Sequence, residues 1–306
     1  MTPKLSIFSI TFNHAPFIRQ ALESILTQRV SFDYEIVVGD DCSTDGMRAI
    51  LEEYQRRFPD RIKPIFRDKN VGMMRNVVET LNQCQGDYIA CLEGDDYWTD
   101  PDKLQLQVDF MDQNPGCALC HHRVAHIASP GETVIREFPA SRFRAPRSEP
   151  HWLAILNYIQ TCSVVFRRKW MPSFDEEFLS LKLGDWPLFA LLSERGSIEY
   201  LDRTMAHYRV HAGNSWNNRA ADYKLRAMEG MAQYLLPRVS DETKPLWRDM
   251  LVALALKDLF LAIRTLSPPK ISDRLNFFFA QSARLGKPFW LFTRLWPYYK
   301  AHYLSV

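Results

Sequence analysis

The residues best suited to chemistry are the acids of the tetrad Glu93-Gly94-Asp95-Asp96, which follows the apolar run 88–92. A short apolar run that ends in polar residues is typical of a buried β-strand. Three carboxylates at the end of such a strand repel one another unless a cation lies among them. Oxygen ligands suit Mg²⁺ or Mn²⁺, and these ions commonly accompany phosphates. The tetrad therefore indicates either a metal–phosphate site or an acidic, solvated turn.

The first 125 residues alternate between predicted strands and predicted helices. Strands are expected at 5–11, 34–38, 61–66 and 88–92. Helices are expected to begin at Pro16, after a cap at Ser43 or Thr44, after the turn 70–72, and at Pro101. This alternation predicts an α/β fold with a mostly parallel, doubly wound sheet.

In such a sheet, ligands bind where the carboxyl ends of the strands meet. The predicted order of elements brings four segments to that edge, namely 11–13, 40–45, 70–72 and 93–96. Their carboxylates come from separate strands and can converge on one ligand. The shared edge therefore favours a functional site over a solvated turn.

The second half of the chain is less regular. Residues 129–150 are rich in proline and arginine and predict a loop. Strands are expected at 160–166 and 197–210, and a helix at 188–192 follows Gly184-Asp185-Trp186-Pro187. From about residue 220 the pattern is helical. We expect a catalytic domain over 1–215 and a helical C-terminal region over 216–306.

Composition excludes several classes of protein. The net charge of +2 gives no global basic bias, so we expect no nucleic-acid partner. The N-terminus has no signal-peptide pattern and no uncharged apolar run reaches membrane-spanning length, which predicts a cytoplasmic protein. The six cysteines lie in or beside apolar segments, as reduced core thiols do. Cys117-Ala118-Leu119-Cys120-His121 has the spacing of a haem or zinc motif, but we interpret it as a core strand.

The C-terminal region combines aromatic and basic residues. From Arg264 to the end there are seven Lys/Arg and one acid, Asp273. Such a segment suits the interface of a membrane, with aromatic rings at the headgroups and cations near anionic lipid. We therefore expect residues 270–306 either to contact the inner face of the cytoplasmic membrane or to pack as a helical hairpin on the catalytic domain or on another subunit. Nucleic-acid binding by stacking and charge is a third and less favoured alternative.

Taken together, the motifs of residues 4–215 resemble glycosyltransferase family 2, whose members have the GT-A fold. The segments that carry the resemblance are Thr11-Phe12-Asn13, Asp40–Gly46, Asn70-Val71-Gly72 with Arg75-Asn76, Gly86–Asp96, Gly184-Asp185-Trp186 and Tyr208-Arg209-Val210-His211. The resemblance implies a metal-dependent, inverting transfer of sugar from a nucleotide donor, most often a UDP-sugar, to a glycan or a lipid-linked glycan of the cell surface. Mn²⁺ or Mg²⁺ is the implied cofactor.

The resemblance also assigns roles. One of Asp95 and Asp96 is implied to ligate the metal and the other to contact ribose, with His211 as a further metal or diphosphate contact. Asp185 is implied to be the catalytic base, and the alternative for a residue at that place is a plain helix cap. The expected metal ligands are therefore Asp95, Asp96 and His211, and the expected nucleotide-sugar contacts are Thr11, Asn13, Asp40, Asp41, Asn70, Gly72, Arg75, Glu93 and Asp95.

Some of these roles have independent chemical arguments. A carboxylate accepts the N3–H of uracil, which favours Asp41 for base recognition. Arg75 could reach the diphosphate or remain an exposed helix residue. Trp98 and Trp186 could stack on sugars or belong to the core. Glu93 departs from the family, which commonly has Asp there, so whether its longer side chain reaches the ribose, the metal or neither stays open.

Two other functions compete with sugar transfer. A nucleotidyltransferase on a related sheet would be expected to carry a glycine-rich phosphate loop after the first strand, and Thr11-Phe12-Asn13-His14 is not one. A non-catalytic nucleotide-sugar-binding module would not need the acids at 95, 96 and 185. The sequence leaves the donor sugar, the acceptor and the oligomeric state open.

Overall fold

The computed structural model describes residues 2–128, 132–148, 150–211, 216 and 218–264. It contains two compact units, one of Met1–Ser180 with Gly184–Asn214 and one of Leu181–Leu183 with Ser215–Val306. Every candidate site residue belongs to the first unit. Residues 270–306, for which the sequence suggests membrane contact, lie outside the described residues. No helix among the described residues has the length and apolar character needed to span a membrane.

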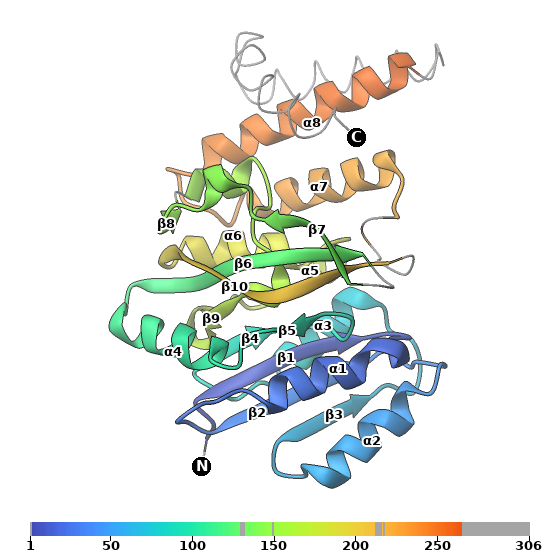
Figure 1. The fold of residues 1–306 in the computed structure, drawn as a ribbon. Helices are drawn as coiled ribbons and strands as arrows, with labels where there is room; N and C mark the ends of the chain where they lie inside the picture. Colours follow the sequence, from blue (N-terminus) through green and yellow to red (C-terminus); the bar gives the residue numbers. More distant parts are fainter. Residues whose placement is uncertain (1, 129–131, 149, 212–215, 217, 265–306) are drawn as a thin grey trace. The chain divides into compact units, whose positions relative to one another are not determined.

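One mixed sheet forms the first unit (Figure 1). Its parallel half has the order β3-β2-β1-β4, and β9 pairs antiparallel with β4 and with β6. β10 runs parallel to β6 and antiparallel to β5 and β8. The strands are β1 Leu5–Thr11, β2 Tyr34–Asp40, β3 Ile62–Phe66, β4 Tyr88–Cys91, β5 Tyr97–Trp98, β6 Cys117–Ala128, β7 Thr133–Phe138, β8 Arg147–Ser148, β9 Val165–Arg167 and β10 Ser197–Val210.

The helices of the first unit follow the strands. The α-helices are α1 Ala15–Leu26, α2 Met47–Arg57, α3 Met73–Leu81, α4 Lys103–Gln113, α5 Glu176–Leu179 and α6 Asp185–Ser193. The short 3₁₀ helices are η1 Ser141–Phe143, η2 Pro150–Ala154, η3 Thr161–Ser163 and η4 Arg168–Trp170. The second unit contains α7 Ala221–Leu235 and α8 Lys244–Arg264. The helical pattern predicted after residue 220 is confirmed as far as residue 264.

The burial pattern explains why the parallel half forms. Every residue of β2 and β4 is buried, as expected for strands covered on both faces. β3 is less buried and contains Pro64, which an edge strand tolerates. The register of the sheet pairs Thr11 with Asp40, so the carboxyl ends of β1 and β2 lie together. Gly94 N–H donates to the carbonyl of Ile10 at 3.2 Å, which brings the acidic turn to the same edge.

Three local predictions were wrong. Residues 160–166, which were expected to form one strand, contain the 3₁₀ helix η3, and β9 begins only at Val165. The segment expected to be a loop, 129–150, contains β7, which pairs with β6 although its side chains are largely exposed. Neither Ser43 nor Thr44 caps α2, because the cap is Gly46 at φ +91°. Asp45 binds the helix instead, since its Oδ1 accepts from Met47 N–H at 3.2 Å. The haem-like spacing at Cys117 and Cys120 is, as expected, part of a buried strand.

Two glycines allow a test of the packing against β1. A Cβ built on Gly86 would lie 2.5 Å from the backbone carbon of Leu5 and the backbone nitrogen of Ser6, whereas a Cβ on Gly116 meets nothing within 4 Å. We expect Gly86→Ala to lower the free energy of unfolding by about 1–3 kcal/mol. The added methyl group would clash with the backbone of β1, which cannot move aside as a flexible side chain can. Gly116→Ala is the matched control. Urea unfolding checks both, and equal midpoints would contradict this account.

Candidate functional site

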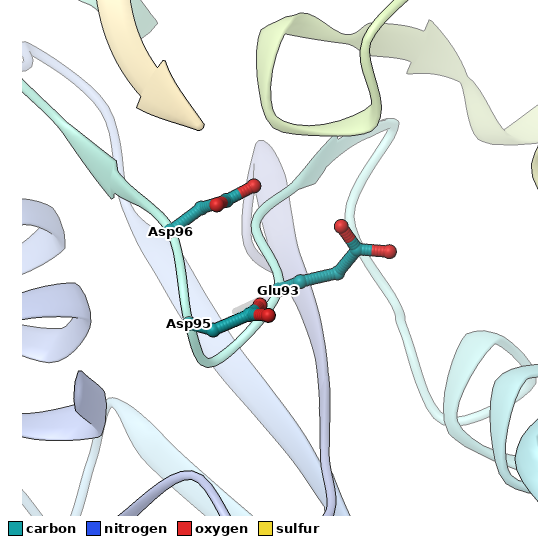
Figure 2. Close-up of side chains that lie close together, drawn as sticks. All are labelled: Glu93, Asp95 and Asp96. Atoms are coloured by element: carbon teal, nitrogen blue, oxygen red, sulfur yellow. The ribbon is translucent and has the colours of Figure 1, made fainter. Parts of the chain in front are cut away.

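Three carboxylates gather in the turn after β4. One oxygen from each of Glu93, Asp95 and Asp96 lies within 4.8 Å of the others (Figure 2). Asp95 is 8% exposed and Asp96 is fully buried. Asp96 Oδ1 accepts from Arg209 N–H at 2.9 Å, while its Oδ2 accepts no hydrogen bond from an N–H or O–H group of the described residues. The donor set is therefore made of closely spaced hard oxygens.

The electrostatics of the turn show the cost of this arrangement. Burial, followed by the charges of Asp95 and Asp185, raises the pKa of Glu93 to about 8. Burial and the charges of Asp95 and Glu93 likewise raise the pKa of Asp96 well above its ordinary value. Since both acids resist ionisation without a counter-charge, the residues fit a divalent cation.

Histidines approach the third carboxylate. His211 Nε2 lies 3.0 Å from Asp95 Oδ2, and His14 Nε2 lies 3.8 Å from the same oxygen. Although burial opposes ionisation, the hydrogen bond from His211 and the charge of His14 lower the pKa of Asp95. His211 therefore lies beside the expected metal ligand, as the sequence suggested. His14 was missed, and its only signal was its place directly after Thr11-Phe12-Asn13.

Gly94 permits this close approach. A Cβ on Gly94 would lie 2.9 Å from Thr11 Oγ1 and 3.2 Å from His14 Nδ1. The side chains of Thr11 and His14 thus occupy the space that any other residue at position 94 would need. The glycine in the tetrad is explained by this contact.

Arg209 supports the turn from β10. Besides its backbone bond to Asp96, its guanidinium donates to the carbonyl of Asp95 at 2.8 Å and lies 4.4 Å from the ring centre of Tyr97. Its side chain is 4% exposed. Sequence reasoning assigned Arg209 no role, because a strand arginine gives no sign that its backbone and side chain bind the same turn.

The Asp41 carboxylate organises the loop at 70–72. The carboxylate accepts hydrogen bonds from Val71 N–H at 2.7 Å and from Gly72 N–H at 3.0 Å. The backbone carbonyl of Asp41 accepts a further bond from Asn70 Nδ2 at 3.3 Å. The structure therefore brings Asp41, Asn70 and Gly72 together, as expected. Each carboxylate oxygen retains a second lone pair for a ligand.

Asp40 and Asn13 hold the neighbouring loop. Ser43 Oγ donates to Asp40 Oδ1, and burial raises the pKa of Asp40. Asn13, at φ +57°, accepts from Thr44 N–H at 2.9 Å, and its own N–H donates to Ser43 Oγ at 2.9 Å. These contacts join the ends of β1 and β2 into one surface.

Three other candidates lie in different surroundings. The side chain of Arg75 is 47% exposed and lies 3.8 Å from both Glu79 and Glu176. Trp98 and Trp186 are 4% and 5% exposed, and their indole N–H groups donate to the carbonyls of Cys162 and Leu153. The suggestion that these tryptophans stack on sugars is therefore wrong, because both rings belong to the core.

Asp185 is the first residue of α6. Burial raises its pKa, while its Oδ2 accepts a hydrogen bond from Asn157 Nδ2 at 2.9 Å. The cap residue of α6 is Gly184, so Asp185 lies at the first helical position and not at the cap. The effect of Asp185 on the pKa of Glu93 places the two carboxyls within electrostatic range. Asn157 was not foreseen from the sequence.

Comparison with known proteins identifies the family. The model of the family "Glycosyl transferase family 2" matches residues 6–171, more than half of the chain. The chain belongs to glycosyltransferase family 2. Uncharacterized protein Rv1520 of Mycobacterium tuberculosis is 40% identical over 218 residues, which cover 71% of this chain and 62% of that protein. The chain thus spans less than two thirds of the length of this curated relative.

Other relatives carry functional names or solved structures. The putative teichuronic acid biosynthesis glycosyltransferase TuaG of Bacillus subtilis is 32% identical over 164 residues, covering 53% of this chain and 61% of TuaG. Residues 1–349 of S. aureus TarS, solved with UDP-GlcNAc, have a TM-score of 0.59 at 19% identity, with 94% of this chain and 93% of that one covered. The mannosyltransferase PcManGT of Pyrobaculum calidifontis, solved with GDP-Man and Mn²⁺, has a TM-score of 0.56 at 16% identity, with 100% and 87% covered. The predicted GT-A fold is confirmed.

The raised pKa of Glu93 predicts a pH dependence of stability. Because the folded protein binds this proton more tightly than the unfolded chain does, stability falls as pH rises from the ordinary value of 4.5 through about 8. We expect Glu93→Gln to remove that part of the dependence. Urea unfolding across this range in EDTA measures it, and parallel pH profiles for the two proteins would contradict the raised pKa.

Proposed function

We propose that the protein transfers a sugar from a UDP-sugar to a hydroxyl of a glycan or lipid-linked glycan, with inversion at C1 and with help from Mn²⁺ or Mg²⁺. The observation that carries the proposal is the acidic cluster within electrostatic range of Asp185. The acidic cluster would form the donor end of the transfer site, and Asp185 would form the acceptor end. The name of TuaG supports a role in cell-surface polysaccharide biosynthesis.

At the donor end, Asp95 and Asp96 would hold the cation together with His211. A bound divalent cation supplies charge neutralisation for the diphosphate as it leaves. Asp41 would receive the uracil N3–H, and Thr11, Asn13, Asp40, Asn70, Gly72 and Glu93 would line the nucleotide. Arg75 would have to leave its two glutamates to reach the diphosphate. The UDP-GlcNAc bound to TarS supports a uridine nucleotide, and a hexosyl or N-acetylhexosaminyl group would be transferred.

At the acceptor end, Asp185 would act as the general base. In its ionised form it accepts the proton of the acceptor hydroxyl while that oxygen attacks C1 opposite the departing diphosphate. The burial that raises its pKa also makes the carboxylate a stronger base. Asp185 is only partly buried, so an acceptor can reach it.

The competing functions have less support. Membership of glycosyltransferase family 2 argues against a nucleotidyltransferase. A non-catalytic binding module would have no use for a carboxylate near the acidic cluster, and the placement of Asp185 argues against that reading.

A donor screen tests the proposal. We expect nucleotide release from one UDP-sugar in a panel of UDP-, GDP- and CDP-sugars, assayed with Mn²⁺. Asp185→Asn should lower kcat roughly 100-fold or more and leave UDP affinity unchanged, because the amide keeps the shape but cannot take a proton. Arg48→Ala, an exposed change on α2, is the control. Release only from a GDP-sugar would reject the donor, and full turnover by Asp185→Asn would reject the base.

A further inference from the structure

The segment 153–160, from the end of η2 to the start of η3, supplies the side chain that contacts Asp185. We propose that Asn157 is a positioning residue, whose amide fixes Oδ2 of Asp185 so that Oδ1 faces the acceptor hydroxyl. The inference rests on the proposed base role of Asp185. It deepens that role by naming the group that orients the base.

The orientation of the Asn157 amide is itself fixed. Its Oδ1 accepts from Ile159 N–H at 3.2 Å, and this leaves the NH₂ group directed to Asp185 Oδ2 at 2.9 Å. If the amide were flipped, its oxygen would face the carboxylate and its NH₂ group would face a backbone N–H. Neither pair can form a hydrogen bond. Both hydrogen bonds therefore require the same rotamer and the same amide orientation.

The segment that carries Asn157 is anchored in the core. Leu153 and Tyr158 are fully buried, and Ile159 is 2% exposed. The carbonyl of Leu153 also accepts from Trp186 Nε1 at 2.7 Å. Two successive residues of α6 are thus held by one buried segment, but only the bond from Asn157 reaches a carboxyl group.

The charges around Asp185 make this bond consequential. Burial disfavours its ionised form, and Glu93 is a nearby acid that interacts with it. Backbone N–H groups at the start of α6 and the Asn157 amide favour the ionised form, and among the described residues Asn157 is the side chain that does so. Removing the Asn157 amide should therefore both release the carboxylate and make it harder to ionise.

The matched variants are Asn157→Ala and Trp186→Phe. Asn157→Ala removes the hydrogen bond to Asp185. Trp186→Phe removes the neighbouring hydrogen bond from the Trp186 indole to the carbonyl of Leu153. Carbon-13 NMR of protein labelled at the aspartate carboxyl carbons, with MgCl₂ present, follows the titration of Asp185. The Asp185 signal is the one that is missing from the spectrum of Asp185→Asn. We expect Asn157→Ala to move the Asp185 midpoint to higher pH and Trp186→Phe to leave it in place.

Kinetics give a second readout. With the UDP-sugar selected by the donor screen, Asn157→Ala should lower kcat roughly tenfold and leave KM for the donor unchanged. In the profile of kcat against pH, the limb at low pH should move to higher pH. An unmoved Asp185 midpoint in Asn157→Ala, or an equal shift in Trp186→Phe, overturns the positioning role while leaving the proposed function intact. Full turnover by Asp185→Asn overturns both.

Discussion

The mutual repulsion of three carboxylates at the end of β4 is the constraint on which the site depends. Glu93, Asp95 and Asp96 lie close enough together that burial and their own charges raise the pKa of two of them. In water these acids would separate, but the sheet holds them at one edge. A divalent cation would remove the repulsion, and under the proposed function the same cation would neutralise the departing diphosphate.

Several features of the fold make sense as responses to that repulsion. Arg209 binds the turn through its backbone and its guanidinium, which fixes the geometry of the acids. His14 and His211 direct ring nitrogens at Asp95, so that this acid is the one whose pKa is lowered. Gly94 leaves room for His14 and Thr11 beside the turn. Asp185 adds a further negative charge that helps to raise the pKa of Glu93, and a cation in the cluster would offset this charge.

The sequence predicted the features that depend on local pattern. Buried strands followed by polar residues identified β1, β2 and β4 and the edge where their carboxyl ends meet, and the residues at that edge lie together as expected. The strand β7 escaped prediction because its side chains are largely exposed and it is held by pairing with β6. The cap of α2 was misassigned because a glycine with positive φ replaced the expected hydroxyl.

The missed site residues share one property, which is that their partners are distant in sequence. His14 meets Asp95, Arg209 meets Asp95 and Asp96, and Asn157 meets Asp185 across 28 residues. No spacing rule connects such pairs, since only the assembled sheet brings them together. The two tryptophans could not be assigned from the sequence, because a buried indole and a sugar-stacking indole look alike there.

Calorimetric titration of UDP in the presence and absence of Mn²⁺ tests the central claim most directly. If the acidic cluster holds a cation that neutralises the diphosphate, Mn²⁺ should tighten UDP binding at least tenfold, and Asp95→Asn should abolish that gain. The affinity of Asp95→Asn for UDP without metal should remain close to that of the unmodified protein. Equal affinity for UDP with and without Mn²⁺ in the unmodified protein would contradict the account.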